Sequence, residues 1–187
     1  VLIQDLGMFD LVRKTYPELE IHASTQMHIN NLDGVKLMEE LGMKRVVLPR
    51  ELSLEEIKEI KDNSTIELEV FVHGALCVSY SGQCLMSSLI GGRSGNRGAC
   101  AGSCRLKYDV VDEDGKKLNK FSYPLSMKDL NSLENVGNLI ESGVSSLKIE
   151  GRMKSVEYVY MVVSMYREAI DSYYKTGKVM IDEDKFL

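Results

Sequence analysis

The chain has 187 residues, of which 44% are hydrophobic and 27% are charged, and its formal net charge is −5. This composition predicts a folded globular protein and excludes a disordered chain. No run of about eighteen apolar residues occurs, which argues against a membrane-spanning helix, and the acidic balance argues against indiscriminate binding to nucleic acid.

The chain begins with a short apolar stretch, residues 1–7, that has no charged leader and no cleavage site. No signal peptide is therefore predicted, and we expect a cytoplasmic protein. From this start, the first seventy residues alternate apolar strand patterns with amphipathic helix patterns at a period of about 20 to 25 residues, which is typical of successive βα units with parallel strands. Strands are predicted at 1–4, 20–23, 45–48 and 66–72, and helices at 8–15, at 33–41 and after Ser53, where Ser53 to Glu56 has the pattern of a capping box.

A segment rich in glycine, serine and cysteine then interrupts this alternation. It is followed by a predicted hairpin that pairs 108–111 with 121–125 around the turn Asp114-Gly115. Afterwards the pattern resumes with a helix at 133–142, a strand at 144–149 and a long helix at 152–174. The apolar residues of that last helix that recur every three or four positions predict a buried stripe: Val156, Val159, Val163, Tyr166, Ile170 and Tyr173.

The predicted fold class is therefore α/β, and we expect a partial TIM-like barrel with a cysteine-rich loop and a β-hairpin insertion. A closed barrel of eight βα units needs about 250 residues, so the chain is too short to close one. Because it also begins without Met, we interpret it as the C-terminal portion of a barrel whose N-terminal portion is missing; the alternative is a complete open sheet. The predicted parts are 1–75, the βα repeats; 76–126, the cysteine loop and hairpin; and 127–187, the final βα unit and C-terminal helix.

All cysteines of the chain lie in the loop, with the spacing C-x6-C-x15-C-x3-C: Cys77, Cys84, Cys100 and Cys104. Clustered thiolates are ligands for an iron-sulfur cluster or for zinc. Structural zinc sites usually take their thiolates in two close pairs, and only the last two cysteines form such a pair. The spacing therefore favours a 4Fe-4S cluster, with zinc as the alternative, and two disulfides are a weaker interpretation for a domain of this size.

The same region is the most basic part of the chain, since no acidic residue occurs from Val70 to Tyr108. The candidates for binding a carboxylate or a phosphate are Arg93, Arg97 and Arg105. Their charge can offset the thiolates around a metal, and it can also bind an anionic substrate such as RNA. Both interpretations stay open at this point, and both can hold together.

Polar residues follow the predicted strands and, in a barrel, would meet at the carboxyl ends of these strands, where catalytic groups gather. They include Gln26, Arg50 and Glu51. The catalytic candidates among them are His22, His73, Glu150 and Arg152. A structural ion pair between Glu150 and Arg152 is the alternative, with Glu69 as a buried partner of such an arginine. For a protease, the sequence has neither an H-E-x-x-H helix nor a G-x-S-x-G elbow. A Cys77–His73 pair is possible only if Cys77 does not bind iron.

The run EVFVHGALCVSYSGQCLMS, residues 69–87, resembles the signature of the collagenase-like peptidase family, family U32, at every fixed position. The stretches 125–130 and 146–155 also resemble this family, in particular its tRNA-hydroxylating branch. The resemblance implies a 4Fe-4S cluster on the four cysteines and oxygen-independent hydroxylation of RNA, with a tRNA uridine as the first expectation. It also implies a prephenate-like carboxylate as oxygen donor, while other family members act on ubiquinone precursors. The family name keeps peptide hydrolysis, and a noncatalytic metal-binding fragment, as alternatives.

Overall fold

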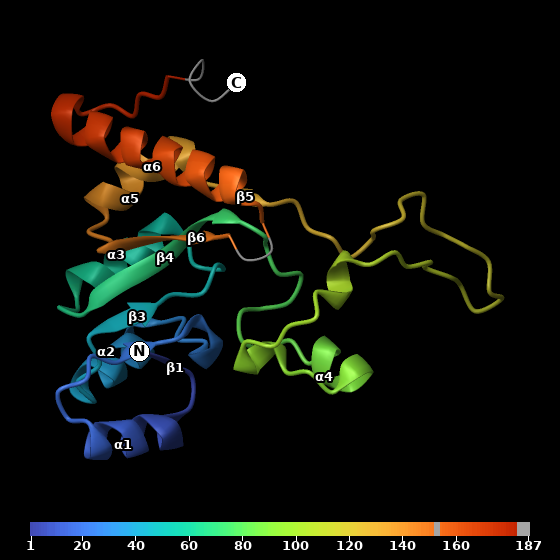
Figure 1. Ribbon diagram of the computed structural model, residues 1–187, viewed down its shortest axis with the longest axis horizontal. Helices are drawn as coiled ribbons and strands as arrows, with labels where there is room; N and C mark the ends of the chain where they lie inside the picture. Colours follow the sequence, from blue (N-terminus) through green and yellow to red (C-terminus); the bar gives the residue numbers. More distant parts are fainter. Residues whose placement is uncertain (152–153, 183–187) are drawn as a thin grey trace.

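The computed structural model of the chain describes residues 1–151 and 154–182. Its centre is a six-stranded mixed sheet in which β1, β2, β3 and β4 are parallel neighbours and β4 also pairs in parallel with β6. Figure 1 shows α1 beyond β1 at one end of the sheet and α5 and α6 beyond β6 at the other, while the cysteine segment extends to the side. The predicted α/β class with a parallel sheet is confirmed.

The strands and helices follow the predicted order. The strands are β1 (Leu2–Ile3), β2 (His22–Ala23), β3 (Arg45–Val47), β4 (Glu67–Gly74), β5 (Leu130–Asn131) and β6 (Ser146–Glu150). The helices are α1 (Leu6–Thr15), α2 (Leu32–Glu40), α3 (Leu54–Asp62), α4 (Met86–Gly91), α5 (Val136–Glu141) and α6 (Val156–Thr176), with 3-10 turns η1 (Thr25–Met27), η2 (Gly95–Arg97), η3 (Ser103–Arg105) and η4 (Leu133–Asn135). Among the residues that the structure describes, no helix combines the length and the apolar character that a membrane span requires.

Local signals in the sequence explain where the helices begin. The capping box of α3 is present, because the Ser53 hydroxyl accepts from the Glu56 amide and the Glu56 carboxylate accepts from the Ser53 amide. Side chains of Asp5, Asn31 and Ser155 cap α1, α2 and α6 in a similar way. Such caps satisfy amide groups that the first turn of a helix leaves without a partner.

The core lies between the sheet and the helices. Along β4, Leu68, Val70 and Val72 are buried and alternate with residues of the opposite face, as a strand requires. Helix α6 packs on this core through Val162, Tyr166 and Ala169. The predicted stripe of α6 is therefore wrong in part, because Val156 is 80% exposed and Val163 is 48% exposed.

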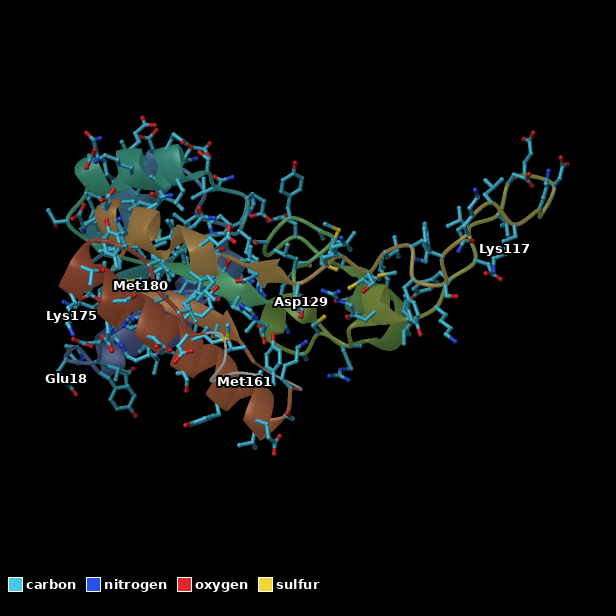
Figure 2. All side chains as sticks on the ribbon, turned by 90° about the horizontal axis from the view of Figure 1, so that it is seen from above. Glu18, Lys117, Asp129, Met161, Lys175 and Met180 are labelled. Atoms are coloured by element: carbon cyan, nitrogen blue, oxygen red, sulfur yellow. The ribbon has the colours of Figure 1, made fainter. Side chains whose placement is uncertain are left out.

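The predicted hairpin is also corrected by the structure. Residues 107–125 form two extended segments that run antiparallel, but a single bridge between Val111 and Lys117 is the only β-pairing in this range. The Leu118 amide donates to the Val110 carbonyl at 2.7 Å and the Tyr108 amide donates to the Ser122 carbonyl at 3.0 Å. These residues project from the body of the molecule, with Lys117 at their far end (Figures 1 and 2). We call residues 107–125 the arm.

The sequence pattern does not predict one of the strands. Strand β5 is antiparallel to the end of β4, with Leu130 beside Gly74 and Asn131 beside His73. The Tyr166 hydroxyl of α6 fastens this junction, since it donates to the Val72 carbonyl at 2.7 Å and accepts from the Ser132 amide at 3.1 Å. Burial raises the pKa of Tyr166 to about 12, so this hydroxyl stays protonated at neutral pH. The segment that returns from the arm is thereby held against the sheet.

Candidate functional site

The cysteine segment packs against the carboxyl ends of the parallel strands. Gln26, which follows β2, donates from Nε2 to the Gly95 carbonyl at 3.4 Å. Glu51, which follows β3, accepts from the amide and the hydroxyl of Ser81 at 2.9 and 3.1 Å. Gly82 lies so close to Gln26 that a Cβ on this glycine would be 2.6 Å from the Gln26 carbonyl oxygen. The prediction that polar residues at the strand ends meet at one edge is therefore confirmed for Gln26 and Glu51.

All four cysteines are free thiols; Cys77 and Cys100 are exposed, and Cys84 and Cys104 are half-buried. The Cys100 sulfur accepts from the Gly102 amide at 3.3 Å and lies 3.8 Å from the Ser87 hydroxyl. Burial raises the pKa of the Cys104 thiol; Arg105 acts against this, while the charges of Cys77 and Cys100 add to it. The loop thus brings the charges of these thiols within reach of one another.

The donor chemistry of this loop fits a soft metal centre, because four thiolates are the ligand set of iron-sulfur clusters and of structural zinc. The geometry is more open than such a centre requires. Within 1–151 and 154–182, no three side chains of the His, Cys, Asp and Glu types lie close enough together to hold a metal ion. Binding of a metal by these cysteines therefore requires their sulfur atoms to draw closer together.

The three arginine candidates of the loop have different surroundings. Arg105 donates to the Ser126 hydroxyl at 2.8 Å and to the Leu76 carbonyl at 2.6 Å, so its guanidinium links the cysteine segment to the chain that returns from the arm. Arg93 donates from Nε to the Ala99 carbonyl at 3.0 Å and holds the loop together. Arg97 is exposed at the end of η2 and, in the described part of the chain, leaves its guanidinium to the solvent.

The catalytic candidates that lie in the described residues do not form one cluster. His22 is the first residue of β2, in register with Arg45, and its pKa is lowered by burial and by the Arg45 charge. His73 lies at the junction with α6, where its ring centroid is 5.6 Å from that of Tyr166 and 6.0 Å from that of Tyr158. Glu150 ends β6 beside Gly74. Arg152 lies outside the described residues.

Arg50 makes more interactions at this edge of the sheet than its sequence pattern predicts. The guanidinium of Arg50 lies 3.8 Å from the centroid of the Phe71 ring. Burial lowers the pKa of Arg50, and the negative charges of Glu150, Cys77 and Glu51 oppose that shift. Arg50 is thus a half-buried cation within electrostatic range of Cys77. The sequence contains a partial indication of this contact. Arg50 closely follows a strand, and Phe71 alternates with apolar residues in β4.

Glu69 lies at the centre of a charged network on the same face of the sheet. Its carboxylate accepts from Arg45 at 3.1 Å, from Lys148 at 3.0 Å and from the Ser146 hydroxyl at 2.9 Å. Burial acts to raise the pKa of Glu69, but the hydrogen bonds from Lys148, Ser146 and Arg45 outweigh it and hold this pKa below its ordinary value. The arginine partner of Glu69 in the described residues is therefore Arg45.

Replacing Glu69 by Gln is expected to lower the free energy of unfolding at pH 7 by about 2–3 kcal/mol, because two half-buried cations lose their counter-charge. A carboxyl whose pKa is lowered on folding stabilises the protein above its unfolded pKa of about 4.3, and this contribution disappears as the pH falls through the folded value. Urea unfolding of both proteins at several pH values measures the difference.

The expected difference is constant near neutral pH and shrinks toward zero as the solution is acidified below about pH 4. The exposed Glu18, labelled in Figure 2, provides the control, since Glu18→Gln should change stability by less than about 0.5 kcal/mol. A Glu69→Gln protein as stable as the wild type at pH 7 would contradict the role of this carboxylate.

The family of the chain is identified by comparison with known proteins. The model of Peptidase family U32 matches residues 1–186. The chain is 42% identical over 179 residues to the tRNA hydroxylation protein P1 of Bacillus subtilis (strain 168), and the match covers 92% of this chain and 42% of that protein. It is also 42% identical over 172 residues to the 23S rRNA 5-hydroxycytidine C2501 synthase of Escherichia coli (strain K12), where the match covers 92% of this chain and 26% of that protein.

A third relative, from Methanocaldococcus jannaschii, is named an uncharacterized protease; it is 43% identical over 181 residues, which cover 92% of this chain and 44% of that protein. The chain therefore spans less than half the length of each of these curated relatives. No solved structure matches it significantly.

Proposed function

The chain belongs to peptidase family U32, and from this premise we propose that it is the cysteine-bearing part of an enzyme that hydroxylates RNA, most specifically a uridine of tRNA. The observation that carries the proposal is the attachment of an acid-free, cysteine-rich loop to the carboxyl ends of parallel strands through Gln26 and Glu51. In α/β folds this edge is the usual position of an active site. Two relatives named for RNA hydroxylation support the choice of substrate.

In this proposal Cys77, Cys84, Cys100 and Cys104 hold a 4Fe-4S cluster, with zinc as the alternative metal. A bound cluster supplies electron transfer or Lewis acidity. The chain's own contribution is local: the Gly102 amide and the Ser87 hydroxyl orient the Cys100 sulfur, and Arg50 supplies positive charge within electrostatic range of Cys77. Arg97, whose guanidinium is exposed, is suited to bind a phosphate or the carboxylate of a prephenate-like oxygen donor.

We further propose that the parallel strands β1, β2, β3, β4 and β6 are part of a TIM-like barrel. The remaining strands would come from another portion of the same protein, because the relatives are more than twice as long as the matched region. A barrel would enclose the charged face around Glu69 and leave the cysteine loop at its open end. Action on tRNA also fits a cytoplasmic location.

The test is complementation. The whole protein that contains this chain is expressed in Bacillus subtilis lacking its own tRNA hydroxylation protein P1, and the nucleosides of tRNA and rRNA are measured by mass spectrometry. Hydroxylated uridine is expected to appear with the wild type and not with an empty vector. Nucleosides that remain unmodified, although the protein is folded and loaded with iron, would contradict the proposal.

Peptide hydrolysis is the second candidate, because one relative carries the name of a protease. His73 lies against the rings of Tyr158 and Tyr166 and also interacts with Asp129 and Asn131, while Cys77 acts electrostatically on Arg50 and Cys104. A Cys–His nucleophile pair gains no support from these contacts. Cleavage of gelatin that is lost in both Cys77→Ala and His73→Ala would nevertheless establish this activity.

A further inference from the structure

The arm is exposed along most of its length and projects from the cysteine segment. Figure 2 shows it reaching away from the sheet, with Asp129 near its root and Lys117 near its tip. Two aromatic side chains on its returning segment are open to solvent: Phe121 is 79% exposed and Tyr123 is 49% exposed. Exposed aromatic rings that lie close together on a surface are typical of a binding site.

The charges of the arm are separated along its length. No acidic residue occurs from 115 to 128, a range that contains Lys116, Lys117, Lys120 and Lys128. Two acidic residues of the outgoing segment are engaged locally, since Asp109 pairs with Lys117 and the Asp112 carboxylate accepts the Lys116 amide at 2.8 Å. Lys107 and Lys120 therefore lie toward the root, with the exposed rings, whereas the acidic residues at 112–114 lie around the turn at the far end.

One of these rings also lies near a cation. The Lys107 ammonium is 5.9 Å from the centroid of the Tyr123 ring. Asn119 holds the returning segment of the arm against the outgoing segment. Its side chain accepts a hydrogen bond from the Val110 amide at 2.8 Å and donates one to the Tyr108 carbonyl at 3.1 Å. Exposed rings flanked by lysines on a held scaffold are the elements of a surface on which unpaired bases stack while cations contact the phosphates.

We infer that the root of the arm binds a single-stranded segment of RNA, with bases stacked on Phe121 and Tyr123 and phosphates on Lys107 and Lys120. This inference rests on the proposed function and names the surface that receives its substrate. Arg105 joins the root to Leu76, the neighbour of Cys77, through a hydrogen bond of 2.6 Å. RNA held on the arm is therefore brought to the cysteine loop. The alternative is that a protein binds here, in which case the surface of that protein would be acidic.

The experiment measures binding of a fluorescein-labelled single-stranded uridine dodecamer to the whole protein by fluorescence anisotropy. Phe121→Ala and Tyr123→Ala are each expected to weaken binding by roughly tenfold or more, because each removes one stacking platform. Tyr160→Ala is the matched control, since Tyr160 is an aromatic residue of α6 that is 73% exposed; it should leave the affinity unchanged.

The lysine variants are expected to change the salt dependence of RNA binding. Replacing Lys107 or Lys120 by Gln should lower the slope of log K against log salt by about 0.7 for each phosphate that the variant no longer neutralises, whereas Lys36→Gln on α2 should not. Melting temperatures equal to that of the wild type are expected for all variants, because the arm is exposed. Equal affinity of the wild type and both aromatic variants would overturn the inference, and it would leave the proposed function intact if the wild type still modifies RNA in cells. A wild type that neither binds nor modifies RNA would refute both.

Discussion

Replacing Cys100 by Ser is expected to reduce the iron content of anaerobically reconstituted protein from about four atoms per chain to about one or fewer. The Cys100 sulfur is the thiol with the best defined surroundings, because it accepts from the Gly102 amide and lies beside the Ser87 hydroxyl. A serine hydroxyl can keep these contacts, but it does not replace a thiolate as a ligand for iron. Under the proposed function, RNA hydroxylation by the whole protein is expected to fall by at least about a hundredfold, because the variant would not hold the proposed cluster.

Two controls distinguish the loss of a metal ligand from a loss of folding. Ser79→Ala, in the same loop, should keep the iron and the activity of the wild type, because the Ser79 hydroxyl makes no hydrogen bond to the described residues. The metal-free forms of Cys100→Ser and of the wild type should melt at the same temperature, whereas only the wild type should gain stability on reconstitution, because metal binding is coupled to folding. Full iron content and an unchanged EPR signal in Cys100→Ser would show that this thiol is not a ligand.

Replacing Gly74 by Ala is expected to lower the free energy of unfolding by about 3 kcal/mol or more. Gly74 has φ +104°, a conformation that residues with a side chain rarely adopt, and it lies opposite Glu150 in the pairing of β4 with β6. A Cβ at this position would be 2.3 Å from the Glu150 carbonyl oxygen, which is a backbone atom and cannot rotate away. The two strands would have to separate at the edge that carries the cysteine loop.

Gly42→Ala is the matched comparison. Gly42 also has positive φ, at +78°, but no atom lies within 4 Å of the position of its Cβ. Its replacement should cost only about 1–2 kcal/mol, which is the intrinsic penalty of a left-handed conformation. Urea unfolding of both variants measures the difference, and equal destabilisation would show that contact with Glu150 adds nothing to the strain at Gly74.

Much of the fold could be predicted because its local signals agree. The alternation in β4 and the capping box at Ser53 each determine one element from a few neighbouring residues. Helix α6 shows the limit of this reasoning. Its apolar residues cover more than one face, so the sequence pattern allows several stripes, and the packing of Tyr166 against the end of β4 decides which one is buried. Strand β5 has two residues, too few for any periodicity to appear.

The part of the candidate site that could be predicted is the part whose residues are close together in the sequence. The four cysteines lie in one loop, and Gln26 and Glu51, which follow β2 and β3, contact that loop. The role of Arg105 could not be predicted, because its acceptors at Leu76 and Ser126 are distant in the sequence and approach it only in the folded chain. The same holds for the contact of Arg50 with the Phe71 ring, which joins the segment after β3 to the middle of β4.

The contacts of Arg105 also make the arm a separable module. Its guanidinium fastens Leu76 to Ser126, and both of these residues lie outside the range 107–125. The hydrogen bonds of Arg105 at the base of the arm therefore do not depend on the length or sequence of the arm. Insertions, deletions or exchanges between Lys107 and Leu125 can therefore change the surface of the arm without disturbing the sheet, so that, under the RNA-binding role inferred for the arm, recognition could vary while the cysteine loop stays the same.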